Sequence, residues 1–137
     1  LLLKGAPTKR IWANKYNGVG GHVECGEDVL SSAKRELDEE TGLSAALRLM
    51  GTLQVDVEPK MGICVYVLTG ECLSGEPRPS EEGTLFWLPF DKLDQYPLVE
   101  DVAILLEKIR KMQAGEPPFS ARSFYDQNEK LTVHFGE

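Results

Sequence analysis

Two segments of the chain carry apolar residues at the spacing of an amphipathic helix. The first helix is predicted to begin after Asp28, because Asp is a preferred N-terminal cap. It is predicted to end at Gly42, because glycine readily adopts the left-handed conformation that often follows the last helical turn. The apolar face of this helix is formed by Val29, Leu30, Ala33 and Leu37.

The second helix is predicted over residues 99–113, and its end is marked by Gly115 and Pro117. Its apolar face is formed by Val102, Leu105, Leu106, Ile109 and Met112. The segment that follows, residues 119–135, predicts two strands around a turn at residues 126–130.

The remaining apolar segments predict strands, because they are rich in β-branched and aliphatic residues. Residues 1–4 are interpreted as the end of a buried strand, and residues 5–19 as a long loop. Residues 45–57 and 62–73 predict two long antiparallel strands joined by a turn, and residues 84–89 predict a shorter strand. The order of elements, β-α-β-β-β-α-β-β, predicts an α/β fold with a mixed β-sheet.

The length of the chain, 137 residues, and its lack of internal repeats or linkers predict a single domain over residues 1–137. No apolar run approaches the roughly 20 residues that a membrane span requires, and no secretory signal pattern is present. We therefore expect a cytoplasmic protein without a membrane partner. Because the chain begins with apolar residues and without Met, we expect its N-terminal strand to be incomplete.

Cysteine content and charge exclude several classes of function. Cys25, Cys64 and Cys72 form no C-x-x-C pair, so we expect reduced thiols and neither a disulfide framework nor a thiolate zinc site. The net charge of -7 disfavours binding to a nucleic acid polymer, which requires clustered Lys and Arg. An anionic substrate of such an acidic protein needs a bridging cation.

An acidic cluster lies on the first predicted helix. Glu36, Glu39 and Glu40 stand at positions i, i+3 and i+4, so their carboxylates project from one face. Oxygen ligands at this density suit Mg2+ or Mn2+ better than zinc. The alternative is a solvated acidic face. Gly20 and Gly21 precede the helix, and a backbone without side chains allows a phosphate or metal to approach closely.

The combined spacing of residues 21–43 resembles the Nudix box, G-x5-E-x7-R-E-U-x-E-E-x-G-U, in which U is an aliphatic residue. All seven fixed identities and both aliphatic positions are matched. The predicted order of strands and helices is also similar to the Nudix fold, an α/β/α sandwich around a mixed β-sheet.

This resemblance implies a role for each charged residue of the box. Nudix hydrolases bind divalent ions against a diphosphate linkage, so Mg2+ is the expected cofactor, with Mn2+ as a substitute. The implied principal ligands are Glu36 and Glu40, assisted by Glu39 and the carbonyl of Gly21, with Glu27 as a further ligand or support. Arg35 resembles the family's arginine that orients the neighbouring carboxylates.

The implied reaction is in-line attack of a metal-activated water on phosphorus. Members of the family differ in their general base, which is a box glutamate in some and a residue of a later loop in others. In this chain the box candidates are Glu39 and Glu40, and the loop candidates are Glu81 and Glu82, of which Glu82 is better placed. The alternative for the loop pair is an exposed acidic loop.

Outside the box, the chain resembles the MutT-like branch, which hydrolyses oxidised purine nucleoside triphosphates such as 8-oxo-dGTP. That resemblance implies base recognition by Asn17 and by Glu100 or Asp101, of which we favour Asp101, and approach of the substrate to Gly20. The alternative to base recognition is a structural role for each residue. An Asn before a glycine is a common turn pair, and an acid at the start of a helix is a common cap. Trp87 and Phe86 are candidates for stacking on a purine or for the core.

Two other functions are compatible with the sequence. The first is a Nudix hydrolase of another nucleoside diphosphate derivative, such as ADP-ribose or a dinucleoside polyphosphate, for which Pro59 gives weak support. The second is a non-catalytic Nudix module that binds a nucleotide, although such modules often lose box acids and this chain retains all of them.

Overall fold

The computed structural model describes residues 1–136, and its elements follow the predicted α/β order. The strands are β1 (Leu2–Gly5), β2 (Tyr16–Asn17), β3 (Ser44–Glu58), β4 (Met61–Ser74), β5 (Gly83–Phe86), β6 (Phe119–Tyr125) and β7 (Leu131–Phe135). The helices are α1 (Val29–Thr41), the 3-10 helix η1 (Phe90–Gln95) and α2 (Glu100–Lys111).

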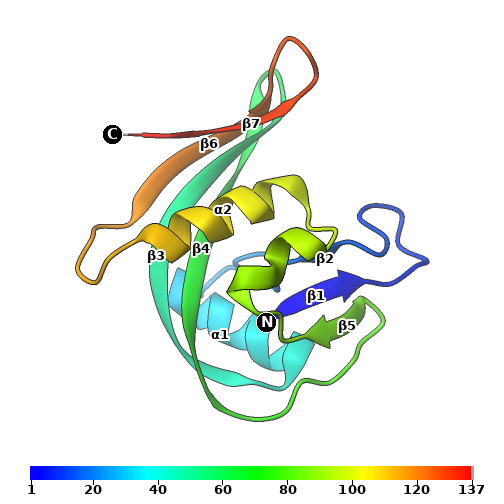
Figure 1. Ribbon diagram of the computed structural model, residues 1–137. Coiled ribbons are helices and arrows are strands. Elements are labelled where there is room, and N and C mark those ends of the chain that lie inside the picture. Colours follow the sequence, from blue (N-terminus) through cyan, green and yellow to red (C-terminus); the bar gives the residue numbers. More distant parts are fainter. Residues whose placement is uncertain (137) are drawn as a thin grey trace.

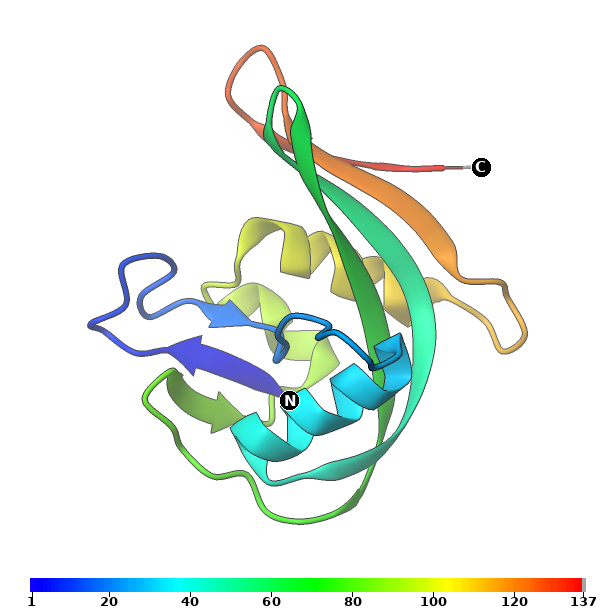
Figure 2. The same cartoon turned by 180° about the vertical axis from the view of Figure 1, so that it is seen from behind.

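The strands form two sheets. The larger sheet has the order β4-β3-β6-β7, and it is mixed because β3 and β6 run parallel while the other pairs are antiparallel. The smaller sheet has the order β2-β1-β5 and is antiparallel. Helix α2 covers one face of the larger sheet and α1 lies on the other (Figure 1 and Figure 2). The layered α/β/α arrangement predicted from the sequence is therefore confirmed.

The main core lies between α2 and the larger sheet. Leu53 of β3 is 2% exposed, and Leu105 of α2 packs in the same cluster. The other buried members of this cluster are Met50, Phe119 and Ala121. Burial of each such side chain contributes roughly 1.5–3 kcal/mol, so this layer fixes α2 on the sheet.

Helix α1 begins and ends at the predicted residues. The Asp28 carboxylate caps the N-terminus by accepting hydrogen bonds from the Ser31 backbone N–H at 2.9 Å and the Ser31 hydroxyl at 2.7 Å. At the other end Gly42 has φ 76°, and its N–H donates to the Asp38 carbonyl at 2.8 Å. These caps set the length of the helix that carries the acidic cluster.

The structure differs from the sequence prediction in three places. The predicted loop 5–19 contains the short strand β2, the predicted strand 84–89 ends at Phe86, and the unpredicted 3-10 helix η1 follows it. The pairing of β5 with β1 stops at Phe86, which lies opposite Leu2, and Pro89 precedes η1. The predicted hairpins on either side of residues 59–60 and 126–130 are confirmed.

Strand β2 joins the smaller sheet to the start of α2. Besides pairing with β1, Tyr16 donates its N–H to the Pro97 carbonyl at 2.9 Å and accepts from the Val99 N–H at 3.0 Å. Val99 is the residue directly before α2. The segment that leads into the box is thereby held beside the N-terminus of α2.

Candidate active site

Arg35 joins the loop before α1 to the acidic face of the helix. Its Nε and Nη2 atoms donate to the two oxygens of Glu27 at 2.9 and 3.0 Å. Nη1 donates to Glu36 at 2.8 Å and to Glu39 at 3.2 Å, and Nη2 also donates to the His22 carbonyl at 3.2 Å. Arg35 therefore contacts three of the four predicted box carboxylates and fixes the path of the loop.

The bidentate contact has a strong electrostatic consequence. The hydrogen bonds that Arg35 donates lower the pKa of the Glu27 carboxyl to about 2, and the acceptance of these bonds by Glu27 and Glu36 raises the pKa of Arg35 in turn. Charge-assisted bidentate bonds are shorter and more directional than neutral ones. Glu27 is thus ionised over the whole physiological range and held in one orientation.

Gly21 and Glu36 approach one another closely. A β-carbon built on Gly21 would lie 2.2 Å from Glu36 Oε1 and 2.5 Å from Oε2, so any side chain at this position would force the Glu36 carboxylate to shift. The Glu36 carboxylate, whose side chain is 15% exposed, occupies the space that a side chain at residue 21 would fill. The sequence interpretation that bare backbone admits a close approach at Gly21 agrees with this contact.

Glu40 is the predicted ligand that Arg35 does not bind. Burial raises the pKa of the Glu40 carboxyl, and the charges of Glu36, Glu82 and Glu39 raise it further. Lys9 acts in the opposite direction. Carboxylates from α1 and from the loop before β5 are therefore neighbours around Glu40, and their mutual repulsion favours a bound cation at this place.

The two loop glutamates differ in their surroundings. Glu82 accepts a hydrogen bond from Lys9 Nζ at 2.6 Å, and its backbone carbonyl accepts from the Ala6 N–H at 3.0 Å. Glu81 is exposed and has no ion pair among the described residues. Glu82, and not Glu81, is also among the charges that raise the pKa of Glu40. Sequence reasoning missed Lys9, because no local pattern marks a lysine whose partner lies 73 positions away.

The residues around Glu36 and Glu40 fit a magnesium ion by their donor chemistry. All the donors are carboxylate or carbonyl oxygens, and Mg2+ is typically held by one or two carboxylates together with substrate phosphates. Within residues 1–136, no three Asp, Glu, His or Cys side chains converge as a ready-made metal site. A site completed by the substrate suits Mg2+, whereas structural zinc requires a closed protein cage.

Two candidate base-recognition residues lie on neighbouring segments. Asn17 follows Tyr16, whose carbonyl is bonded to Val99, and Glu100 and Asp101 open α2 directly after Val99. The Asn17 Oδ1 atom accepts a hydrogen bond from the Gly18 N–H at 2.8 Å, a contact that agrees with the alternative role of Asn17 as a turn residue. The Asn17 amide nitrogen has no partner among the described residues, so it is available to a ligand.

The two acids at the start of α2 are not equivalent. Asp101 is half-buried and Glu100 is exposed, and burial raises the pKa of the Asp101 carboxyl. The two oxygens of this carboxyl can accept hydrogen bonds from a ligand. Gly20, the remaining predicted substrate residue, borders open space, since no atom lies within 4 Å of a β-carbon built there.

The two candidate stacking residues lie at the surface. Trp87 is 60% exposed and Phe86 is 40% exposed, so neither belongs to the core. Phe86 packs edge-on against Tyr16 with ring centroids 5.8 Å apart. The core alternative is therefore wrong for Trp87, and its role in stacking stays a prediction.

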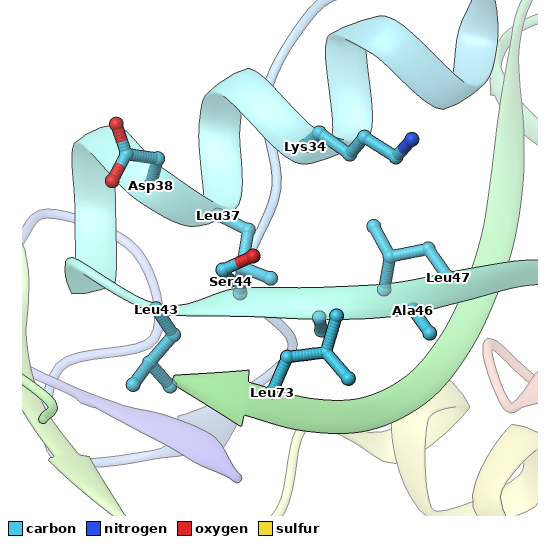
Figure 3. A pocket seen from close by; sticks show the side chains of 9 residues that line it. Lys34, Leu37, Asp38, Leu43, Ser44, Ala46, Leu47 and Leu73 are labelled. Atoms are coloured by element: carbon cyan, nitrogen blue, oxygen red, sulfur yellow. The ribbon is translucent and has the colours of Figure 1, made fainter. Parts of the chain in front are cut away.

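A separate hollow of about 560 Å³ lies between α1 and the strands β3 and β4 (Figure 3). It is bordered by Lys34, Leu37 and Asp38 of the helix, by Leu43 directly before β3, and by Leu47 and Leu73 of the two strands. None of the predicted site residues borders this hollow. The acidic face of α1 and this hollow are therefore distinct surfaces.

Comparison with known proteins identifies the class. Residues 1–109 match the family model of the NUDIX domain, so the chain belongs to the Nudix family. No helix among the described residues has the length and apolar character to cross a membrane.

Two curated relatives carry the name oxidized purine nucleoside triphosphate hydrolase. The protein of Danio rerio is 32% identical over 67% of this chain, and that of Mus musculus is 33% identical over 72% of it. The matches cover 60% and 63% of the lengths of those two relatives, respectively.

Solved structures of MutT proteins share the fold. A MutT protein from Bacillus halodurans superposes with a TM-score of 0.80 and 20% identity, covering 98% of this chain and 87% of that one. The E. coli ORF135 protein has a TM-score of 0.63 and 27% identity, covering 85% of this chain and 83% of that one. Together with the family match, these superpositions confirm the Nudix fold predicted from the box.

Proposed function

We propose that this protein is a Nudix pyrophosphohydrolase that cleaves a nucleoside triphosphate to the monophosphate and pyrophosphate with Mg2+. We further propose that it favours an oxidised purine nucleotide such as 8-oxo-dGTP. The observation that carries the proposal is the intact acidic face of α1, where the Glu36 carboxylate lies against the backbone of Gly21 and the charges of Glu36, Glu82 and Glu39 add to burial in raising the pKa of Glu40.

In this proposal Glu36 and Glu40 are the principal metal ligands, with Glu39, Glu27 and the Gly21 carbonyl in supporting positions. The bound Mg2+ would neutralise phosphate charge and make a bound water more acidic. Arg35 acts by orientation, because its guanidinium fixes Glu27, Glu36 and Glu39 relative to one another. Such orienting partners typically affect metal affinity or activity by about 10- to 100-fold.

Proton transfer requires a carboxylate close to the attacking water. We assign this role to Glu82, with Glu39 and Glu40 as the box alternatives. The water oxygen forms a bond to phosphorus, its proton passes to the carboxylate, and the bridging P–O bond between the first and second phosphates breaks. Its electron pair leaves with the departing phosphate oxygen, so the products are one monophosphate and one pyrophosphate.

Base recognition is assigned to Asn17 and Asp101. Their support is that β2 and the start of α2 are bonded to each other through Tyr16 and Val99. An amide and a carboxyl with a raised pKa offer both donors and acceptors to the edge of a purine. The names of the two curated relatives favour the same class of substrate. We also infer that residues 1–137 act as one domain, since β6 pairs with β3 beyond the matched family segment.

A substrate panel tests the proposal. Rates of hydrolysis with Mg2+ are measured for 8-oxo-dGTP, dGTP, dATP, ADP-ribose and a dinucleoside tetraphosphate, and the products are identified by chromatography. The proposal predicts the highest kcat/KM for 8-oxo-dGTP. A preference for ADP-ribose would reject the base-recognition assignment, and tight nucleotide binding without turnover would indicate a non-catalytic module.

A further inference from the structure

We propose that Lys9 is a positioning residue for hydrolysis, and that its ammonium group holds the Glu82 carboxylate in one orientation. This inference rests on the proposed function and on Glu82 as the proton acceptor. It assigns a role to the loop between β1 and β2, which no feature of the Nudix box includes.

The contact between Lys9 and Glu82 is direct. Lys9 Nζ lies 2.6 Å from Glu82 Oε2, and the two side chains are 33% and 57% exposed. An exposed ion pair of this kind stabilises a fold very little. The pair is therefore better explained by the orientation of the Glu82 carboxylate than by a contribution to the stability of the fold.

The backbone around Lys9 is arranged to make this contact. The Lys9 N–H donates to the Ala6 carbonyl at 3.0 Å, which turns the chain back, and the Ala6 N–H donates to the Glu82 carbonyl at 3.0 Å. Lys9 and Glu82 are thus attached to the same short hydrogen-bonded unit. Because the backbone already places the two residues close together, the ion pair forms with only a small loss of side-chain entropy in Lys9 and Glu82.

The ion pair with Lys9 explains why the Glu82 carboxylate keeps one position. The Glu82 side chain is 57% exposed, and the only hydrogen bond that its carboxylate accepts among the described residues comes from Lys9 Nζ. Without Lys9, no other hydrogen bond or ion pair of the described residues would keep this side chain from rotating into solvent. The attacking water would then lose its proton acceptor.

A direct contact between Lys9 and a substrate phosphate is the competing explanation, and a double-mutant cycle separates the two. The variants are Lys9→Met, Lys9→Arg, Glu82→Gln and the double variant Lys9→Met with Glu82→Gln. Arg10→Met is the matched control, because Arg10 is an exposed cation of the same loop and has no ion pair in residues 1–136.

We expect Lys9→Met to lower kcat about tenfold with less than about a twofold change in KM, because a displaced base weakens proton transfer. Lys9→Arg should restore most of the rate, and Arg10→Met should match wild type. In the Glu82→Gln background, Lys9→Met should have no further effect. Amide hydrogen exchange of the metal-free protein provides an independent readout, with faster exchange at residues 80–83 in Lys9→Met than in wild type or Arg10→Met.

The inference is overturned if Lys9→Met raises KM equally with and without Glu82, which indicates a phosphate contact, or if it leaves both kcat and exchange unchanged. Either result leaves hydrolysis by the wild-type protein in place. A wild-type protein that hydrolyses no nucleotide would instead reject the proposed function, and the inference with it.

Discussion

Arg35 donates hydrogen bonds to both carboxylate oxygens of Glu27, from Nε at 2.9 Å and from Nη2 at 3.0 Å. Glu27 lies directly before the N-terminal cap of α1, whereas Arg35 lies within the helix. This contact closes the glycine-rich loop onto the helix. The same guanidinium also binds Glu36 and Glu39, so the side chain of Arg35 orients three carboxylates of the box.

The Glu27 pair makes the stability of the metal-free protein depend on pH. Because Arg35 lowers the pKa of Glu27 to about 2, the pair stabilises the fold fully above the ordinary glutamate pKa of 4.5. That stabilisation is lost as the pH falls from 4.5 toward 2. Glu27→Gln should therefore lower the thermal midpoint at pH 7, and its difference from wild type should shrink on acidification. Glu24→Gln, at an exposed residue 4.0 Å from Arg35, should show a much smaller effect.

Arg35→Lys should reduce activity although it keeps the charge. A lysine cannot bind Glu27 through two nitrogens while also holding Glu36. We expect kcat/KM to fall about 10- to 100-fold and the Mg2+ concentration for half-maximal rate to rise. Titration of the rate with Mg2+ measures both. Arg110→Lys, which alters an exposed pair with Glu107 on α2, is the control, and an equal loss in both variants would contradict the orienting role.

Gly21→Ala should displace the Glu36 carboxylate, because the new β-carbon would lie 2.2 Å from Glu36 Oε1. We expect at least about a tenfold loss of activity and weaker Mn2+ binding, measured by electron paramagnetic resonance. Gly18→Ala is the matched control, because no atom lies within 4 Å of a β-carbon built at Gly18. Wild-type metal affinity in Gly21→Ala would argue against Glu36 as a ligand.

The helix that carries the site could be predicted from sequence because its signals are local. The cap at Asp28 and the left-handed Gly42 act within one turn, and the carboxylate face follows from helical spacing alone. The long hairpin of β3 and β4 was equally clear, since its turn is short and its strands are adjacent in sequence.

Features that depend on distant partners could not be predicted. Strand β2 has only two residues, and it exists because Tyr16 pairs with Lys4 of β1 on one side and bonds to Pro97 and Val99 on the other. The pair of Lys9 and Glu82 is likewise a product of the tertiary fold. The exposure of Trp87 also escaped prediction, because strand-like sequence continues past the residue where pairing stops.

Asp101→Asn should change base selectivity. The substitution keeps the size of the half-buried side chain but replaces one carboxyl oxygen, which can accept hydrogen bonds, with an amide nitrogen, which only donates them. Because one unpaired hydrogen bond costs about 1–3 kcal/mol, kcat/KM for 8-oxo-dGTP should fall roughly 5- to 150-fold. Glu100→Gln, at the exposed neighbour, should change it less than about threefold. A larger effect of Glu100→Gln would transfer the recognition role to that residue.

The central claim is that the acidic face of α1 supports Mg2+-dependent cleavage of a nucleoside triphosphate. Phosphorus-31 NMR of 8-oxo-dGTP mixed with the protein tests it most directly. The account predicts equal amounts of monophosphate and pyrophosphate with Mg2+, no products with EDTA, and a rate at least about 100-fold lower for Glu40→Gln. Absence of pyrophosphate in the presence of Mg2+, or an equal rate for Glu40→Gln and wild type, would contradict it.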